Sequence, residues 1–117
     1  MTPPVFQTCM ASTAVTDIIG DRLYQDEAEQ GVNAPFVVWQ MIGGTPENYI
    51  NQLPDLDSYN IQFDCYAKDQ YTVETLAKSL RDAVEPAANI VAWRGTGREQ
   101  GTRLYRYSFD VEWMVPR

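Results

Sequence analysis

The sequence of 117 residues predicts an α+β fold: two helices packed on one face of a mainly antiparallel four-stranded sheet, with one hairpin that carries a long extended loop. Apolar residues at spacings of three and four predict the helices, and apolar residues that alternate with polar ones predict the strands. Clusters of glycine and proline separate these segments. The length is typical of one domain, and we expect residues 1–117 to form a single folded unit.

A helical region is predicted near the N-terminus. Thr2 can cap a first helix, and the two prolines that follow suit its first turn, where a missing N–H is tolerated. Ser12 can cap a second short helical turn, which Gly20 ends. Residues 22–24 fit a brief edge strand, and the polar segment 25–35 is a predicted loop. The apolar positions of the helical region are Val5, Phe6, Cys9, Met10, Val15, Ile18 and Ile19.

The longest predicted loop lies between two strands. Residues 36–42 are almost all apolar, as in a strand covered on both faces, and Gly43 and Gly44 are expected to end this strand. Residues 59–67 alternate between apolar and polar side chains, which is typical of a second strand. Connections longer than about 12 to 15 residues are uncommon in compact domains and are often functional. We therefore expect the segment between these strands to carry a function.

A second helix and a second hairpin complete the predicted fold. Asp69 or Thr72 can cap the helix, and Pro86 limits its end. Residues 89–94 and 104–115 are the predicted strands of the hairpin, joined by a glycine-rich turn. The apolar face of the helix consists of Val73, Leu76, Ala77, Leu80, Ala83, Val84 and Ala87.

The composition favours a chain that stays in solution. No apolar run approaches the roughly 18 to 20 residues of a membrane span, and the first residues lack the pattern of a signal peptide. We therefore expect a chain that is made in a cytoplasm and has no membrane partner. In a reducing compartment Cys9 and Cys65 would remain thiols, and we expect both to be small apolar residues of the core.

The charge of the chain is acidic and unevenly placed. The net charge of −7 argues against a nucleic-acid-binding surface, because phosphate affinity comes from clustered Lys and Arg. There are 13 acidic and four basic residues before Arg94, and five basic and three acidic residues from Arg94 onward. A solvated surface would explain this distribution. Two complementary flanks that associate head to tail would explain it equally well.

The sequence offers little catalytic chemistry. It contains no histidine, which excludes histidine-based acid–base catalysis, Ser-His-Asp triads and histidine-ligated metals. The glycine-rich turn at 95–101 precedes a strand, whereas a phosphate-binding loop opens a helix. Glu47, Asp55 and Asp57 lack the spacing of an EF-hand loop. We therefore expect no enzymatic activity, no cofactor and no metal site.

Five segments carry a family resemblance. They are Gly20-Asp21-Arg22-Leu23-Tyr24 after the first helical region, Pro35-Phe36-Val37-Val38 at the start of a strand, GTPENYI, PDLDSYNIQFDCYA and the helix YTVETLAKSLRDAVE. In this combination they resemble the small tail completion proteins of long-tailed bacteriophages, also called tail terminators or tail-to-head joining proteins. The resemblance extends over roughly residues 5–115, and from residue 95 onward it is one of pattern only.

The resemblance implies a structural protein of the virion. Such proteins form a ring, typically hexameric, that caps the tail tube, ends its polymerisation and offers a surface to the head connector. The implied partners are further copies of the chain, the tail tube protein and the head–tail connector protein, at the head-proximal end of a tail assembled in the bacterial cytoplasm. DNA would pass through the ring without specific binding, which fits the acidic balance. The alternative is another virion component, such as a head-side connector, a neck protein or a tail tube subunit.

The long loop is the predicted contact with a neighbouring subunit. It holds apolar residues outside any regular pattern, and two prolines limit its entropy. A loop folded back as a lid on its own core is the alternative. Two arginines of the basic flank are expected to contribute to the same contacts. The predicted interface residues are Pro46, Glu47, Asn48, Tyr49, Ile50, Leu53, Pro54, Asp55, Leu56, Asp57, Arg98 and Arg103.

Overall fold

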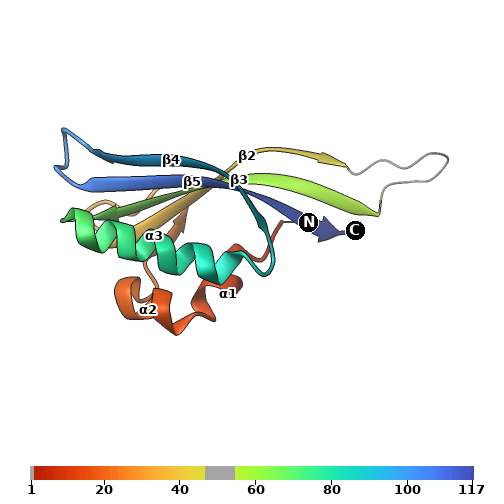
Figure 1. Cartoon of the computed structure of the whole chain (residues 1–117), viewed down its shortest axis with the longest axis horizontal. Helices are drawn as coiled ribbons and strands as arrows, with labels where there is room; N and C mark the ends of the chain where they lie inside the picture. The colour runs from red at the N-terminus through yellow and green to blue at the C-terminus, as the bar shows by residue number, and fades with distance from the viewer. Residues whose placement is uncertain (1, 47–54) are drawn as a thin grey trace.

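The computed structural model describes residues 2–46 and 55–117 of the chain. These residues form an α+β fold in which the strands make one mixed sheet of order β1-β2-β3-β5-β4 (Figure 1). In this sheet β1 is parallel to β2, and the other neighbours are antiparallel. The helices are α1 (Val5–Met10), α2 (Thr13–Ile19) and α3 (Gln70–Val84). The strands are β1 (Leu23–Gln25), β2 (Phe36–Pro46), β3 (Leu56–Ala67), β4 (Asn89–Arg98) and β5 (Tyr105–Pro116).

The described residues form five strands and three helices, so the predicted numbers of four strands and two helices were wrong. β1 is a fifth strand, and it pairs in parallel with β2 through Leu23 and Val37. The expected edge strand at 22–24 is thus present, one residue later along the chain. Three residues are too few for an alternating pattern to show that this strand joins the main sheet. Arg22 holds its start, because the guanidinium donates to the carbonyl oxygens of Pro35 at 2.9 Å and Ile18 at 3.3 Å. The N-terminal helical region forms two separate helices, α1 and α2.

The helix starts follow from their caps. Ser12 begins α2 by accepting a backbone N–H three residues on, and Gly20, with a φ of 61°, follows its last residue. Of the two candidate caps of α3, Asp69 is the one observed, because its carboxylate accepts the N–H of Thr72 at 2.9 Å. The expected cap Thr2 was wrong, since α1 begins after the two prolines with no side-chain cap.

The β2–β3 hairpin extends farther than predicted. β2 ends at Pro46 and β3 begins at Leu56, and Pro46 pairs with Asp57. Gly44 was expected to end the strand. It lies so close to β3 that a Cβ at this position would be 2.9 Å from the carbonyl oxygen of Ser58. The glycine therefore permits strand pairing here, and several residues predicted as loop belong to strands.

The β4–β5 hairpin is also longer than predicted. β4 continues to Arg98, and its pairing with β5 shifts at two places, between Ile90 and Ala92 and between Trp93 and Gly95. These shifts are β-bulges, and Gly95 supplies left-handed backbone at the second with a φ of 78°. Much of the predicted glycine-rich turn is therefore strand.

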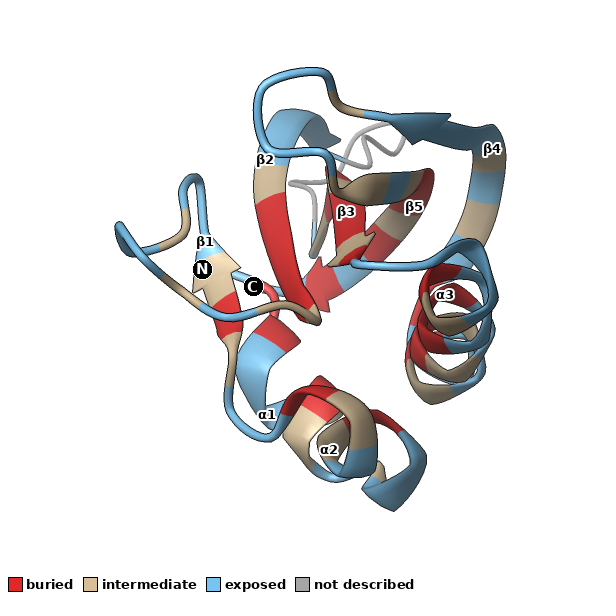
Figure 2. Ribbon diagram, turned by 90° about the vertical axis from the view of Figure 1, so that its left-hand side faces the viewer, coloured by how far each residue is buried: buried red, intermediate tan, exposed pale blue. Residues whose placement is uncertain are grey.

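The core lies between the helices and the sheet. Figure 2 shows the buried segments of β2, β3 and β5 together with the buried faces of the helices. Phe63 and Phe109 stack within it, with ring centroids 5.3 Å apart. Both cysteines are buried, as predicted. Of the predicted helical face, Ala87 lies past the end of α3 and is exposed. The buried residues of α3 are Val73, Leu76, Ala77, Leu80 and Val84.

One end of the sheet extends beyond the helices (Figure 1). β4 begins opposite Glu112, so that residues 44–46, 56–59 and 113–116 form a three-stranded extension, hereafter the arm. The molecule is correspondingly elongated, with extents of 52 × 28 × 24 Å. The tip of the β4–β5 hairpin lies at the opposite end (Figure 1).

Candidate assembly interface

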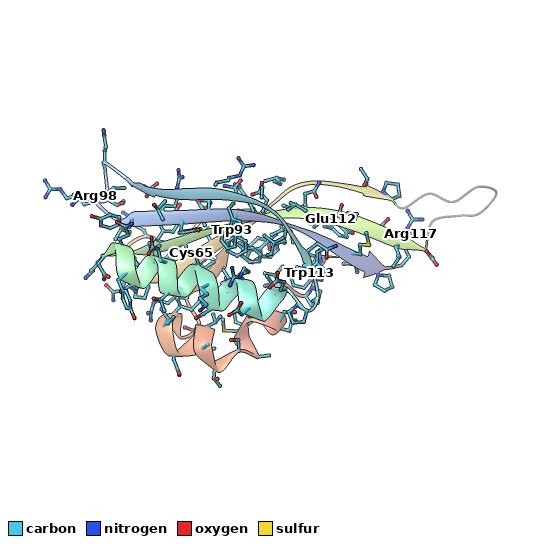
Figure 3. All side chains as sticks on the ribbon, viewed as in Figure 1. Cys65, Trp93, Arg98, Glu112, Trp113 and Arg117 are labelled. Carbon is cyan, nitrogen blue, oxygen red and sulfur yellow. The ribbon has the colours of Figure 1, made fainter. Side chains whose placement is uncertain are left out.

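The predicted interface residues fall into three groups. Those outside the described residues are Glu47, Asn48, Tyr49, Ile50, Leu53 and Pro54. Those at the end of the arm are Pro46, Asp55, Leu56 and Asp57. The remaining two, Arg98 and Arg103, belong to the β4–β5 hairpin at the other end of the molecule, where Figure 3 labels Arg98. The fold therefore does not bring the last two groups together within one molecule.

Arg117 binds the end of the arm. Its Nε donates to Oδ1 of Asp57 at 3.1 Å, and its backbone N–H donates to the carbonyl oxygen of Asp55 at 2.9 Å. Asp57 therefore forms an ion pair with Arg117. The side chain of Asp55 is exposed and makes no ion pair among the described residues. The end of the arm therefore presents one paired carboxylate and one that is open to a partner.

Apolar side chains are exposed on the arm and at its base. Met114 on the arm is 42% exposed, and Met41 and Ile42 at its base are 40% and 46% exposed. Met41 and Met114 lie on opposite faces of the sheet, because their partners on β3, Ile61 and Ser58, point to opposite faces. Exposed apolar side chains of this kind favour burial against another molecule. A hollow of about 250 Å³ between β2 and β3 is lined by Met41, Gly44, Thr45, Pro46, Asp57, Ser58 and Tyr59.

The β4–β5 hairpin carries the two predicted arginines. The guanidinium of Arg98 lies over the ring of Tyr105, 5.7 Å from its centroid. Arg103 adopts a φ of 60°, and its N–H donates to the carbonyl oxygen of Glu99 at 2.9 Å. Arg98 lies at one end of the sheet and Arg117, the ion-pair partner of Asp57, lies at the other (Figure 3). Contacts between these arginines and the carboxylates of the arm therefore need a second molecule.

A groove between α3 and β4 was not among the predicted sites. Trp93 on β4 is 41% exposed, and its ring packs edge-on against Tyr107 with centroids 5.4 Å apart. The guanidinium carbon of Arg81 on α3 lies 5.7 Å from the centroid of the Trp93 ring. The groove has a volume of about 350 Å³ and is lined by Glu74, Ala77, Lys78, Arg81, Trp93 and Tyr107. Only the packing of α3 on the sheet brings these residues together, so no local sequence pattern reveals them.

Buried polar residues lie on the face of the sheet away from the helices. Asp64 accepts a hydrogen bond from the hydroxyl of Ser108 at 2.5 Å and one from the amide of Gln62 at 3.1 Å. Arg94 donates to Asp110 through Nη2 at 2.6 Å and through Nε at 3.1 Å. These hydrogen bonds and the charge of Asp110 raise the pKa of Arg94. Side-chain bonds thus join β3 to β5 and β5 to β4, in addition to the backbone pairing of these strands.

Reactive groups are few in the described part of the chain. There, no three His, Cys, Asp or Glu side chains are grouped so that they could hold a metal ion. Burial raises the pKa of the Cys9 thiol to about 12 and also raises the pKa of Cys65, so both thiols stay protonated at neutral pH. Among the helices of residues 2–46 and 55–117, none is long and apolar enough to cross a membrane.

A sheet with an overhanging arm and exposed apolar side chains is suited to assembly with other molecules. The family model of the tail completion protein gp17 matches residues 3–116, and the chain belongs to this family. The resemblance predicted from the sequence is thereby confirmed. The chain is a structural protein of the bacteriophage tail and a component of the virion, where it assembles with other virion proteins.

A solved structure shares the fold. It is a chain from the virion of a native gene transfer agent particle, with a TM-score of 0.70 and 13% sequence identity. The match covers 97% of this chain and 92% of that chain. Curated proteins include no match to the sequence.

Proposed function

We propose that the chain forms a ring, with six copies as the expected number, that caps the finished tail tube, ends its polymerisation and offers a surface to the head connector. The arm carries this proposal. It extends beyond the helices (Figure 1), and its residues include the exposed Met114 and, at its end, Asp55 and Asp57. Exposed apolar surface on such an extension favours burial against another molecule. Membership of the tail completion family supports a role in finishing the tail.

A ring requires two different surfaces on each copy. A contact between unlike patches is heterologous, and it generates a closed ring when the rotation between copies closes. The chain has unlike patches at its two ends, with carboxylates on the arm and Arg98 and Arg103 on the β4–β5 hairpin. We infer that the predicted interface residues within 46–57, together with these two arginines, make contacts between copies.

The partners of such a ring would be the tail tube protein on one side and the head–tail connector protein on the other. DNA would pass through the centre, and the net charge of −7 suits this passage because an acidic lining repels phosphate. The role requires no catalytic group, cofactor or metal. We take residues 1–117 to form one domain, because one buried cluster joins the helices to the sheet.

Size-exclusion chromatography with light scattering tests the ring directly. The expected result is the mass of six copies, with closed rings in negative-stain images. Extended tubes would indicate a tail tube subunit instead, and a mass of one copy at every concentration would contradict the proposal. Binding to the ends of isolated tail tubes distinguishes a tail terminator from a head-side connector, which would not bind them.

A shortened hairpin tests the segment between the arm strands. Replacing residues 47–56 with Asn-Gly should preserve the hairpin, because two-residue type I′ turns match the twist of paired strands. We expect the variant to melt near the wild-type temperature by circular dichroism, to remain a monomer and to leave tails uncapped. A much lower melting temperature would indicate a lid on the core. Normal melting with normal rings would show that the segment makes no contact between copies.

Charge reversal tests the basic end. Changing Arg98 and Arg103 together to glutamate should weaken self-association, and most strongly at low salt, since exposed charge pairs are screened over about 8 Å at physiological ionic strength. Changing the exposed Lys68 to glutamate provides a control with the same kind of charge change away from the hairpin. Association that responds neither to salt nor to the reversal would leave these arginines as ordinary surface residues.

A further inference from the structure

The arm and the α3–β4 groove cannot meet within one molecule. Trp93 in the groove pairs with Phe109 in the middle of β5, whereas the arm begins beyond Glu112, where β4 starts. The strands of the arm and the groove strand β4 belong to the same hydrogen-bonded sheet, so strand pairing fixes the distance between the arm and the groove. An arm that fills the groove against the exposed face of Trp93 therefore comes from another molecule.

The groove presents an aromatic surface with two cations. The ring of Trp93 is partly exposed, and Arg81 lies over it. Arg81 has one weak exposed ion pair, with Asp82 at 3.4 Å, and Lys78 has none among the described residues. Glu74 is the single acidic residue of the described lining. The groove is therefore suited to a partner that brings apolar side chains and carboxylates together.

The arm brings this combination. Asp55 and Asp57 lie at its end, where Asp57 is paired with Arg117 and Asp55 is open to a partner. Met41 is exposed at its base on the same face of the sheet as Asp57, because Met41 pairs with Ile61 and Asp57 lies four residues before Ile61 on the same strand. The three paired strands make the arm stiff, so that little conformational entropy is lost when it docks. The same chain thus carries both halves of a complementary pair.

We infer that the arm of one copy docks in the α3–β4 groove of the next copy, with Asp55 and Asp57 facing Lys78 and Arg81 and Met41, on the same face as Asp57, packed towards Trp93. The contact joins unlike surfaces and is therefore heterologous, which is the kind of contact that closes a ring. This inference rests on the proposed ring and specifies which surface of the neighbour receives the arm: the carboxylates meet Lys78 and Arg81, while Arg98 and Arg103, which lie outside the groove, contact the neighbour elsewhere.

A charge exchange tests the contact. Lys78→Glu and Asp55→Lys should each weaken self-association by on the order of tenfold, because each places like charges opposite one another. The two changes in one chain should restore it, since the charges are then exchanged. Both side chains are exposed, so folding should be unaffected. Lys68→Glu is the matched control, because Lys68 is exposed and outside the groove.

Cross-linking locates the contact directly. Asp55→Cys and Lys78→Cys in one chain should give covalent oligomers with a short bis-maleimide, while each single variant should give none. The native Cys9 and Cys65 are buried and do not compete. If the wild type forms rings but the double cysteine variant does not cross-link and the charge exchange does not restore association, this docking is wrong and the ring proposal stands. A wild type that stays monomeric at every concentration overturns both.

Discussion

Arg94 is the extra residue of a bulge in β4, and its guanidinium binds the buried carboxylate of Asp110 on β5. The pairing of the two strands shifts between Trp93 and Gly95, and Arg94 donates to Asp110 at this shift through Nη2 at 2.6 Å. The side chain of Asp110 is 8% exposed, and that of Arg94 is 53% exposed. The ion pair therefore fastens an edge strand to the sheet at the point where its ladder of backbone hydrogen bonds is interrupted.

Removing the cation from this pair should destabilise the fold. Arg94→Gln leaves the Asp110 carboxylate buried without a positive partner, which is unfavourable. We expect a clear fall in melting temperature, and a partial recovery in the double variant that also carries Asp110→Asn. Lys68→Gln removes an exposed charge elsewhere and should have little effect. Equal melting temperatures for Arg94→Gln and wild type would show that the pair contributes nothing.

Truncating the core side of α3 should be costly. Leu80 is fully buried, so Leu80→Ala should lower the free energy of unfolding by about 2 to 5 kcal/mol. Thr75→Ala, on the exposed side of the same helix, is the control and should change it little. Denaturant titration measures both. A loss well below about 1 kcal/mol for Leu80→Ala would mean that the site collapses without leaving a cavity.

The cap of α3 should contribute stability that depends on pH. The backbone N–H and the hydroxyl of Thr72 lower the pKa of Asp69 below its ordinary value of 3.8. Its contribution is therefore complete above pH 3.8 and is lost as the pH falls through the lower folded value. The difference in melting temperature between wild type and Asp69→Ala should shrink in this acidic range. A difference that stays constant down to about pH 2 would contradict the assignment.

A methyl group at Gly44 should disturb the arm. Its Cβ would lie 2.9 Å from the backbone oxygen of Ser58, which cannot move aside without breaking strand pairing. We expect Gly44→Ala to cost about 1 to 3 kcal/mol and to weaken self-association. Gly97→Ala is the control, because a Cβ at Gly97 meets no atom within 4 Å. Equal stability and assembly of the two variants would show that the arm tolerates the displacement.

The native thiols should be unreactive until the protein unfolds. Cys9 and Cys65 are fully buried, and their raised pKa values leave little thiolate at neutral pH. A thiol reagent should label neither quickly, whereas the exposed Asp55→Cys should label at once. Rapid labelling of a native cysteine would reveal local opening of the core around α1 or β3.

The elements with a strong period could be predicted from the sequence. The spacing of Leu76, Leu80 and Val84 places them on one side of α3, and all three are buried. In β3, Ile61 and Phe63 alternate with polar residues and point into the core. These patterns hold because burial decides the identity of each residue on one face.

Features that depend on distant partners could not be predicted in the same way. Gly44 and Pro46 are local signals for the end of a strand, yet pairing with β3 continues past them. Lys78 and Trp93 are 15 positions apart along the chain and become neighbours only when α3 packs on the sheet. The candidate groove was not predicted for this reason, whereas the residues at the end of the arm were predicted as interface residues because they flank an unusual local segment.

The bulges of β4 bear on how the protein avoids unwanted growth. A long, regular outer strand is a template onto which further strands can add, and repeated addition leads to fibres. Two interruptions, between Ile90 and Ala92 and between Trp93 and Gly95, break the even spacing of donors and acceptors along this border. At the high concentration of copies in an infected cell, β4 is therefore a poor template for adding a strand from another molecule. This disfavours the growth of amyloid from the β4 edge.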